Sequence, residues 1–284
     1  MIRKIIYGLM AVSVLCTLTS CSDDDNFIPS IFDTNPPPRT ALEQWIYDNF
    51  TIPHNVEVTY RWTYIESDLA RNLTPPEEDK AEGFVKIIKQ VWPEPYIAIA
   101  GLDFFNRLAP KQLFLVGSEA WSSSGNYTMG TAEAGRKVVI YDINSFNKSN
   151  KTRLLRYMKT IHHEFTHICN QTVKFDPSYE KITPEGYRPD WNNVSQQQAY
   201  NAGFITPYST SSPTEDFAEM VAVMLTNTAA AWRNMIDNSP DNATAKAALK
   251  AKEEQVVAYY RSVWGFDIYT LQAECEDAIE RAIH

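Results

Sequence analysis

One short motif limits the folds open to this chain. It is His163-Glu164-x-x-His167, in which x is any residue. Residues four apart on a helix differ by about 40° in azimuth, so the two imidazoles project side by side from one face. Two imidazoles in that arrangement can bind one Zn²⁺. Glu164 lies about 100° round from His163, where a carboxylate can take a proton from a metal-bound water. The motif therefore predicts a helix that carries a zinc site and a general base.

The residues around this motif favour a long helix with one buried face. Apolar side chains recur at helical spacing at Leu154, Met158, Ile161, Phe165 and Ile168. The basic residues lie mostly off this stripe and are expected to face water; they are Lys151, Arg153, Arg156 and Lys159. Cys169 lies about 120° round from His163, so we expect it to pack as a small apolar side chain. Whether Cys169 pairs with Cys275 stays open.

The first twenty residues have the pattern of an export signal. Arg3 and Lys4 precede an apolar run, residues 5–18, which is too short to span a membrane. The run ends in Leu-Thr-Ser before Cys21, which resembles the lipobox of bacterial lipoproteins. That resemblance implies removal of residues 1–20 and a lipid on Cys21, although a soluble secreted protein stays an alternative.

Residues 21–39 are predicted to form a flexible tether. Three acidic residues, Asp23, Asp24 and Asp25, open it, and three prolines, residues 36–38, stiffen its end. The acidic run resembles the surface-export tag of Gram-negative lipoproteins that accompany outer-membrane nutrient importers; the alternative is a solvated linker. The chain carries a net charge of −9, which makes nucleic acid a poor candidate as a partner.

The rest of the chain predicts an α+β protein with one domain, residues 40–284. Thr40 and Glu43 form a capping box for a first helix, and Thr74 is expected to cap a second, which Pro93 ends. Strands are predicted at residues 56–62, 112–116 and 137–141, with a hairpin or long loop at 121–135. These elements and the motif helix form an upper part, residues 40–171.

The lower part, residues 172–284, begins with a long polar loop, residues 172–213. Ser195 and Gln198 predict a short helix within it. Pro213 and Thr214 mark the start of another helix. Three more helices are predicted at residues 229–236, 243–264 and 268–283, and they are expected only to pack around the site.

A third metal ligand has to come from outside the motif, because catalytic zinc normally has three protein ligands. His54, His162 and His284 are poor candidates: His162 is expected at the helix surface, pointing away from the pair. A carboxylate is therefore expected. Glu215 and Glu219 lie one helical turn apart and can both face a metal, with Asp216 as the main rival to Glu215.

His-Glu-Phe-Thr-His followed by Glu-Asp-Phe-Ala-Glu from position 215 resembles the gluzincins related to lethal-factor toxins. It also resembles zinc metallohydrolase lipoproteins associated with nutrient importers. The resemblance implies a zincin fold, a small mixed sheet over the motif helix with a C-terminal helical part. It further implies Glu215 as third ligand and Tyr208 as the group that faces the substrate oxyanion, with Tyr200 as the alternative. Glu219 is expected to accept a hydrogen bond from a ligand histidine.

In the zincin fold an edge strand of the sheet pairs with the peptide substrate. Residues 137–141 are the candidate for that edge, and a central position for them stays open. The sequence thus predicts a zinc-dependent metallopeptidase with one Zn²⁺ per chain, a peptide or protein substrate, and a lipid anchor in the outer membrane. Two alternatives are an importer's binding protein that keeps the fold without turnover, and a zinc hydrolase of a non-peptide substrate.

Overall fold

The computed structural model describes residues 38–65, 67–68, 70–121, 127–128, 130–133 and 136–284. The expected signal, Cys21 and most of the tether lie outside these residues. Thr40–His284 form one compact unit, and the description below concerns this unit alone. None of the helices in the described ranges is both long and apolar enough to cross a membrane.

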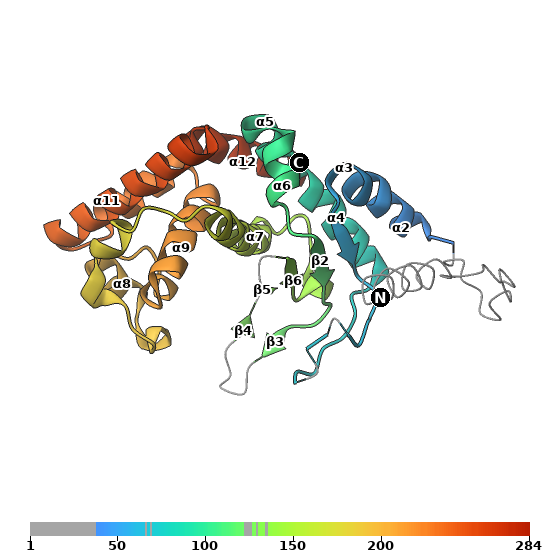
Figure 1. Ribbon diagram of the computed structural model, residues 1–284. Coiled ribbons are helices and arrows are strands. Elements are labelled where there is room, and N and C mark those ends of the chain that lie inside the picture. Colours follow the sequence, from blue (N-terminus) through green and yellow to red (C-terminus); the bar gives the residue numbers. More distant parts are fainter. Residues whose placement is uncertain (1–37, 66, 69, 122–126, 129, 134–135) are drawn as a thin grey trace, which may run out of the picture. The chain divides into compact units, whose positions relative to one another are not determined.

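The motif lies on α7 (Lys151–Thr172), the helix around which the other elements pack (Figure 1). Asn150 caps it by accepting a hydrogen bond from the backbone N–H of Arg153 at 3.0 Å. The predicted apolar stripe is confirmed, because Leu154, Met158 and Phe165 are almost completely buried. The expectation that His162 lies at the helix surface is wrong: its ring is buried, and Nδ1 lies 3.0 Å from the hydroxyl of Tyr96.

A small mixed sheet of four strands packs on one side of α7. Its order is β1 (Glu57–Thr59), β2 (Gln112–Leu115), β6 (Lys137–Ile140) and β5 (Gly130–Glu133). β1, β2 and β6 run parallel, and β5 joins β6 antiparallel. A separate pair is formed by β3 (Ala120–Trp121) and β4 (Tyr127–Thr128).

Both faces of the central strands are apolar, as expected for parallel strands covered on both sides. Leu113 and Val138 join the main core, whereas Phe114 and Val139 point to a second cluster on the opposite face. The candidate edge, residues 137–141, is therefore wrong: β6 lies between β2 and β5, and β5 forms the edge.

The helices before α7 pack around the sheet and α7. They are α2 (Ala41–Ile46), η1 (Tyr47–Thr51), α3 (Ile52–His54), α4 (Glu78–Val91), α5 (Pro93–Ala100), α6 (Leu102–Leu108) and η2 (Ile143–Ser145). The Thr40 capping box is confirmed. α4 starts later than predicted, with Glu77 as its N-cap, because the backbone of Thr74 bonds instead to Gly117 and Ser118. Pro93 opens α5 as well as following α4.

After α7 the chain is helical or irregular. The long loop contains η3 (Tyr179–Lys181), η4 (Pro184–Gly186), η5 (Trp191–Asn193), α8 (Gln196–Asn201) and η6 (Tyr208–Thr210). It is followed by α9 (Pro213–Leu225), α10 (Ala229–Asn238), α11 (Ala243–Tyr259), η7 (Tyr260–Trp264) and α12 (Ile268–Ile283). The short helix predicted from Ser195 and Gln198 is confirmed as α8, and Ser195 caps it in a capping box. Gly265 ends η7 with a φ of 77°, in the left-handed region. Asp267 is the N-cap of α12.

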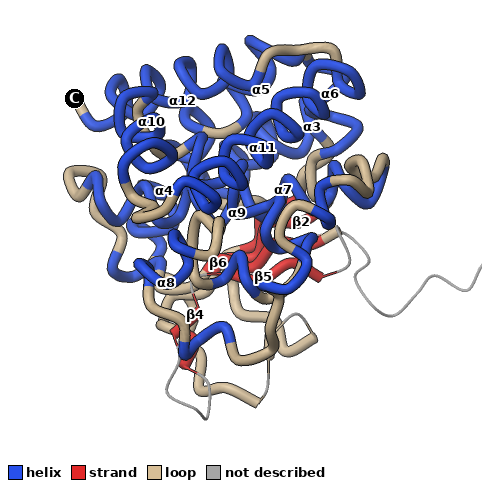
Figure 2. The backbone as a smooth tube through the Cα atoms, turned by 90° about the vertical axis from the view of Figure 1, so that its left-hand side faces the viewer, coloured by secondary structure: helices blue, strands red, loops and turns tan. Residues whose placement is uncertain are grey.

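Figure 2 shows the strands along one side of α7 and the helices α11, α12 and α5 on the other. The α+β prediction of a small mixed sheet over the motif helix, with a C-terminal helical part, is confirmed. This arrangement leaves one face of α7 between β5 and the long loop. The motif histidines lie on that face.

Candidate metal centre

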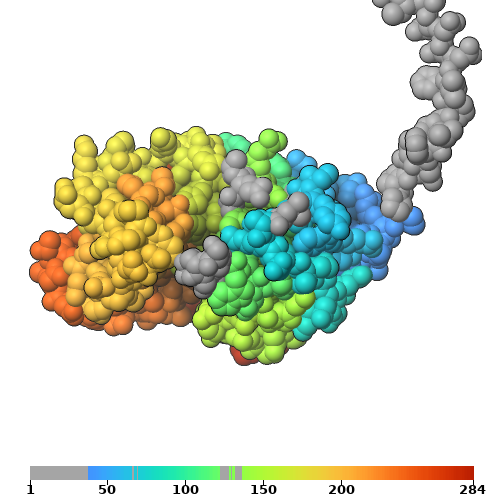
Figure 3. Space-filling model, turned by 90° about the horizontal axis from the view of Figure 1, so that it is seen from below, coloured from blue at the N-terminus to red at the C-terminus, as the bar shows by residue number. Residues whose placement is uncertain are grey.

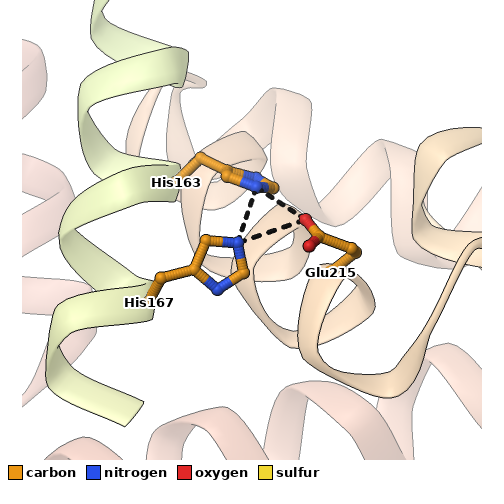
Figure 4. Close-up of side chains that lie close together, drawn as sticks. All are labelled: His163, His167 and Glu215. Atoms are coloured by element: carbon orange, nitrogen blue, oxygen red, sulfur yellow. Dashed lines mark hydrogen bonds and ion pairs between the residues drawn. The ribbon is translucent and has the colours of Figure 1, made fainter. Parts of the chain in front are cut away.

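The structure brings together the three residues predicted as metal ligands, two on α7 and one on α9 (Figure 4). Nε2 of His163 and Nε2 of His167 are 3.0 Å apart. Oε2 of Glu215 lies 2.9 Å from the first nitrogen and 3.1 Å from the second. Ligands of a tetrahedral zinc ion at 2.0–2.1 Å are roughly 3.3 Å apart. Two imidazole nitrogens and a carboxylate oxygen therefore converge closely enough to fit one Zn²⁺.

Glu215 and Asp216 are neighbours on α9, but only Glu215 reaches the centre. Ser212 is the N-cap, and its hydroxyl accepts a hydrogen bond from the backbone N–H of Glu215 at 3.3 Å. Asp216, the rival ligand, points to the interior instead. Its Oδ2 lies 2.7 Å from Nζ of Lys252 and accepts a hydrogen bond from the hydroxyl of Tyr187 at 3.0 Å.

Glu219 lies behind His163 and orients its ring. Nδ1 of His163 donates to Oε1 of Glu219 at 3.0 Å, which leaves Nε2 directed at the centre. The other oxygen of Glu219 accepts from Nζ of Lys159 at 2.7 Å and from the hydroxyl of Thr206 at 2.6 Å. Lys159 was expected to face water only, but it belongs to this network.

The charges around the centre favour a cation. Burial would lower the pKa of His163, but Glu215 and Glu219 outweigh it and raise this pKa to about 9. Burial would raise the pKa of Glu219, yet His163 and Lys159 lower it to about 2. Burial would also raise the pKa of Glu215, yet His163 and His167 lower it well below its usual value. Both carboxylates are thus held as anions beside the two imidazoles. Such a site attracts positive charge, either a proton or a metal ion.

The predicted base and the predicted oxyanion group lie on the same cleft as the centre. Glu164 is 9% exposed, and burial raises the pKa of its carboxyl. The ring of Tyr208 lies 5.7 Å from that of His163 and 4.8 Å from that of Trp191. Burial and the charge of Glu215 raise the pKa of Tyr208, so its hydroxyl stays protonated. Tyr200, the alternative, packs against the main core and does not line the cleft.

The cleft has a volume of about 1220 Å³ and follows the exposed face of α7. Strands β4 and β5 contribute Thr128, Gly130 and Thr131 to one wall, and the long loop and η6 contribute Trp191 and Tyr208 to the other. In Figure 3 the yellow and orange surface faces the green and cyan surface across this hollow.

Edge strand β5 approaches α7 closely at Gly130. A Cβ at this position would lie 2.3 Å from Cγ2 of Thr160, so glycine permits the contact. Residues 130–133 contain few β-branched or aromatic side chains, so no strand is predicted here from the sequence.

The C-terminal helices do more than pack, contrary to the prediction. Lys252 of α11 is completely buried, and its Nζ donates to Asp216 and to the backbone oxygen of Gly203, each at 2.7 Å. Nζ also lies 3.6 Å from the ring centre of Phe204. A signal existed in the sequence, since Lys252 continues a buried stripe that includes Leu249 and Val256.

His54, His284 and the two cysteines of the described residues lie away from the centre. His54 is buried, with Nδ1 2.8 Å from Oδ1 of Asn106, and His284 is an exposed terminal residue. Cys169 and Cys275 are both buried free thiols, which answers the open question of their pairing. The expectation that Cys169 packs as an apolar side chain is confirmed.

Comparison with known proteins was made by family, by sequence and by structure. A family model described as a putative zinc-binding metallo-peptidase matches residues 35–269. Among solved structures, the crystal structure of a putative zinc-binding metallo-peptidase from Bacteroides caccae is similar, with a TM-score of 0.73 and 35% sequence identity. The match covers 89% of this chain and 95% of that one. No curated protein matches the chain.

Proposed function

This chain belongs to the family of putative zinc-binding metallo-peptidases, and from that premise we propose that it hydrolyses peptide bonds with a zinc-activated water. The observation that carries the proposal is the convergence of His163, His167 and Glu215 in a cleft that also holds Glu164 and Tyr208. A site that only stored metal would not need a buried carboxyl and a protonated phenol beside three ligand atoms.

His163, His167 and Glu215 would hold one Zn²⁺, the metal that fits two imidazoles and one carboxylate. Bound zinc supplies a Lewis acid that polarises the peptide carbonyl and makes water a nucleophile near neutral pH. Glu219 keeps His163 in the tautomer whose Nε2 lone pair faces the centre.

Glu164 acts as the general base. Its carboxylate takes a proton from the attacking water and later delivers that proton to the leaving nitrogen. Its raised pKa makes it a better proton acceptor once it is ionised. The hydroxyl of Tyr208 donates a hydrogen bond to the carbonyl oxygen as negative charge develops there.

The test is digestion of a peptide library by the purified protein, with chelator and after zinc is restored. Cleavage should stop with chelator and return with zinc. Glu164→Gln keeps the size and hydrogen bonding of the side chain but removes the base, so bound zinc should be retained while turnover falls drastically. His163→Ala, His167→Ala and Glu215→Ala should lose most of the zinc in elemental analysis. Asp216→Asn, which lies in the interior, should keep it.

Two results would change this assignment. Retention of zinc by Glu215→Gln together with its loss in Asp216→Asn would make Asp216 the third ligand. Peptide binding that is equally strong in wild type and Glu164→Gln, without any cleavage, would make the protein a peptide-binding accessory.

We also propose that the protein is a lipoprotein of the outer membrane, anchored through Cys21 and associated with a nutrient importer. The support is the sequence of residues 1–39, with its short apolar run, Cys21 and acidic tether. Cys21→Ala should release the protein from the outer membrane, which fractionation measures. Protease treatment of whole cells tests surface exposure. Unchanged outer-membrane anchoring of Cys21→Ala would overturn the proposal.

A further inference from the structure

The face of α7 that lines the cleft extends well beyond the metal centre in both directions. Its residues follow one helical stripe, and they are Arg156, Thr160, His163, His167 and Gln171. Lys174 lies just after the helix and also lines the cleft. The cleft therefore runs along α7, with the two histidines in its middle.

Helix geometry gives the reach on each side. Arg156 precedes His163 by seven residues, and Lys174 follows His167 by seven. At 1.5 Å per residue the Cα of Arg156 is displaced by about 10 Å along α7 from that of His163. On the other side α7 ends at Thr172, about 7 Å along the axis from His167, and Lys174 lies beyond that end. An extended peptide advances about 3.3 Å per residue, so the cleft accommodates about three residues on either side of the cleaved bond.

The two cations at these positions are available to a ligand. Arg156 and Lys174 are exposed, and neither forms an ion pair within the described part of the chain. Lys159, between them, differs because it is paired with Glu219.

Most carboxylates of the cleft lie at the metal centre, in the middle of the cleft. Glu164, Glu215 and Glu219 all belong to the metal centre, and only Glu180 lies in the outer part. The outer cleft thus has two free cations and one carboxylate in a chain whose net charge is −9. A local excess of positive charge within an acidic protein favours ligands that carry acidic groups at matching positions.

We infer that the cleft binds extended chains with acidic side chains about three residues to either side of the cleaved bond, and that cleavage is therefore internal. This inference rests on the proposed function. The inference goes beyond the proposed function because it predicts a substrate class and assigns its selection to Arg156 and Lys174.

The first measurement is binding, which does not depend on turnover. Zinc-loaded Glu164→Gln is titrated with a fluorescent twelve-residue peptide that is acetylated and amidated. The peptide has Ala-Leu at its centre and Glu as the third residue on each side of the Ala-Leu bond. The same peptide with Gln at both positions is the comparison. We expect the acidic peptide to bind several-fold more tightly, and the difference to shrink as ionic strength rises.

Variants assign the preference to residues. Arg156→Gln and Lys174→Gln, each made in the Glu164→Gln protein, should each weaken binding of the acidic peptide roughly two- to five-fold and leave the Gln peptide unchanged. Lys148→Gln is the matched control, because Lys148 is exposed, has no ion pair within the described residues and lies outside the cleft. It should bind both peptides as the parent does.

The second measurement is cleavage of the same blocked peptides by wild type. Cleavage of the acidic peptide with the lower KM supports the inference. Equal binding and cleavage of both peptides overturns it and leaves the proposed function standing. Cleavage only of peptides with a free terminus overturns internal cleavage. Selective binding without any cleavage supports the charge preference and overturns the proposed function instead.

Discussion

Nζ of Lys252 lies 2.7 Å from Oδ2 of Asp216, and both side chains are completely buried. Asp216 follows the candidate ligand Glu215 directly, and Gly203, which also accepts from Lys252, precedes the turn that carries Tyr208. This ion pair therefore joins α11 to the two segments that complete the centre. Burial raises the pKa of Asp216 and lowers that of Lys252, and each charge opposes the shift of the other.

Lys252→Met should destabilise the protein by about 3–5 kcal/mol, because it leaves Asp216 as a buried charge without a partner. Lys252→Met combined with Asp216→Asn should recover much of that loss. Lys250→Met is the matched control on the same helix. Its partner Asp237 is partly exposed, so the change should be below about 1 kcal/mol. The free energy of unfolding is measured in urea. A loss in the double variant as large as that in Lys252→Met would contradict this explanation.

Glu219→Gln should weaken zinc affinity about 10–100-fold, since Gln orients His163 without the negative charge that strengthens it as a ligand. Lys159→Met should have a smaller effect on zinc affinity, because it leaves Glu219 in place. Lys151→Met is the control and should leave zinc affinity unchanged. Lys151 lies at the start of α7, far from the centre, and pairs with Glu280 of α12. Competition with a chromophoric chelator measures the affinity. Equal zinc affinity in Glu219→Gln and wild type would show that the negative charge of Glu219 does not strengthen His163 as a ligand.

Tyr208→Phe should lower kcat by about 10²–10³, because it removes one donor to the developing oxyanion. KM should change little, since the hydroxyl matters mainly in the transition state. Tyr200→Phe provides the control, because Tyr200 packs against the core and does not line the cleft. Steady-state kinetics on a cleaved peptide gives both constants. If Tyr208→Phe retains wild-type kcat, Tyr208 has no part in the reaction.

His162 should make the protein sensitive to acid. Burial lowers the pKa of His162 from 6.5 to about 3. Between pH 6.5 and pH 3, His162 is therefore protonated in the unfolded chain but not in the folded chain. The free energy of unfolding falls as the pH drops through this range. The contribution between pH 7 and pH 4 is about 3 kcal/mol.

His162→Asn, which places a polar atom near the position of Nδ1 but does not titrate, should reduce this acid loss. Unfolding in urea at pH 7 and pH 4, with chelator present in every sample, gives the comparison. The difference between the two pH values should be smaller in the variant than in wild type. Equal differences would mean that another group causes the acid sensitivity.

Features that depend on local spacing could be predicted from the sequence. His163 and His167 lie side by side because they are one turn apart on a helix, and so do Glu215 and Glu219 on α9. The capping boxes at Thr40 and Ser195 use groups three residues apart, and both formed as predicted. The sequence by itself therefore determined the motif helix and the group of side chains from which the centre is assembled.

Features that depend on contacts between distant residues were decided by the tertiary structure. β5 pairs with β6 and takes the edge position that had been assigned to residues 137–141. Tyr96 covers His162, for which the sequence predicts a surface position, and Lys252 reaches Asp216 across 36 positions of the chain. Glu215 rather than Asp216 faces the histidines, because packing against Lys252 turns Asp216 inwards. Spacing along a helix specifies which residues share a face, but only packing determines what that face meets.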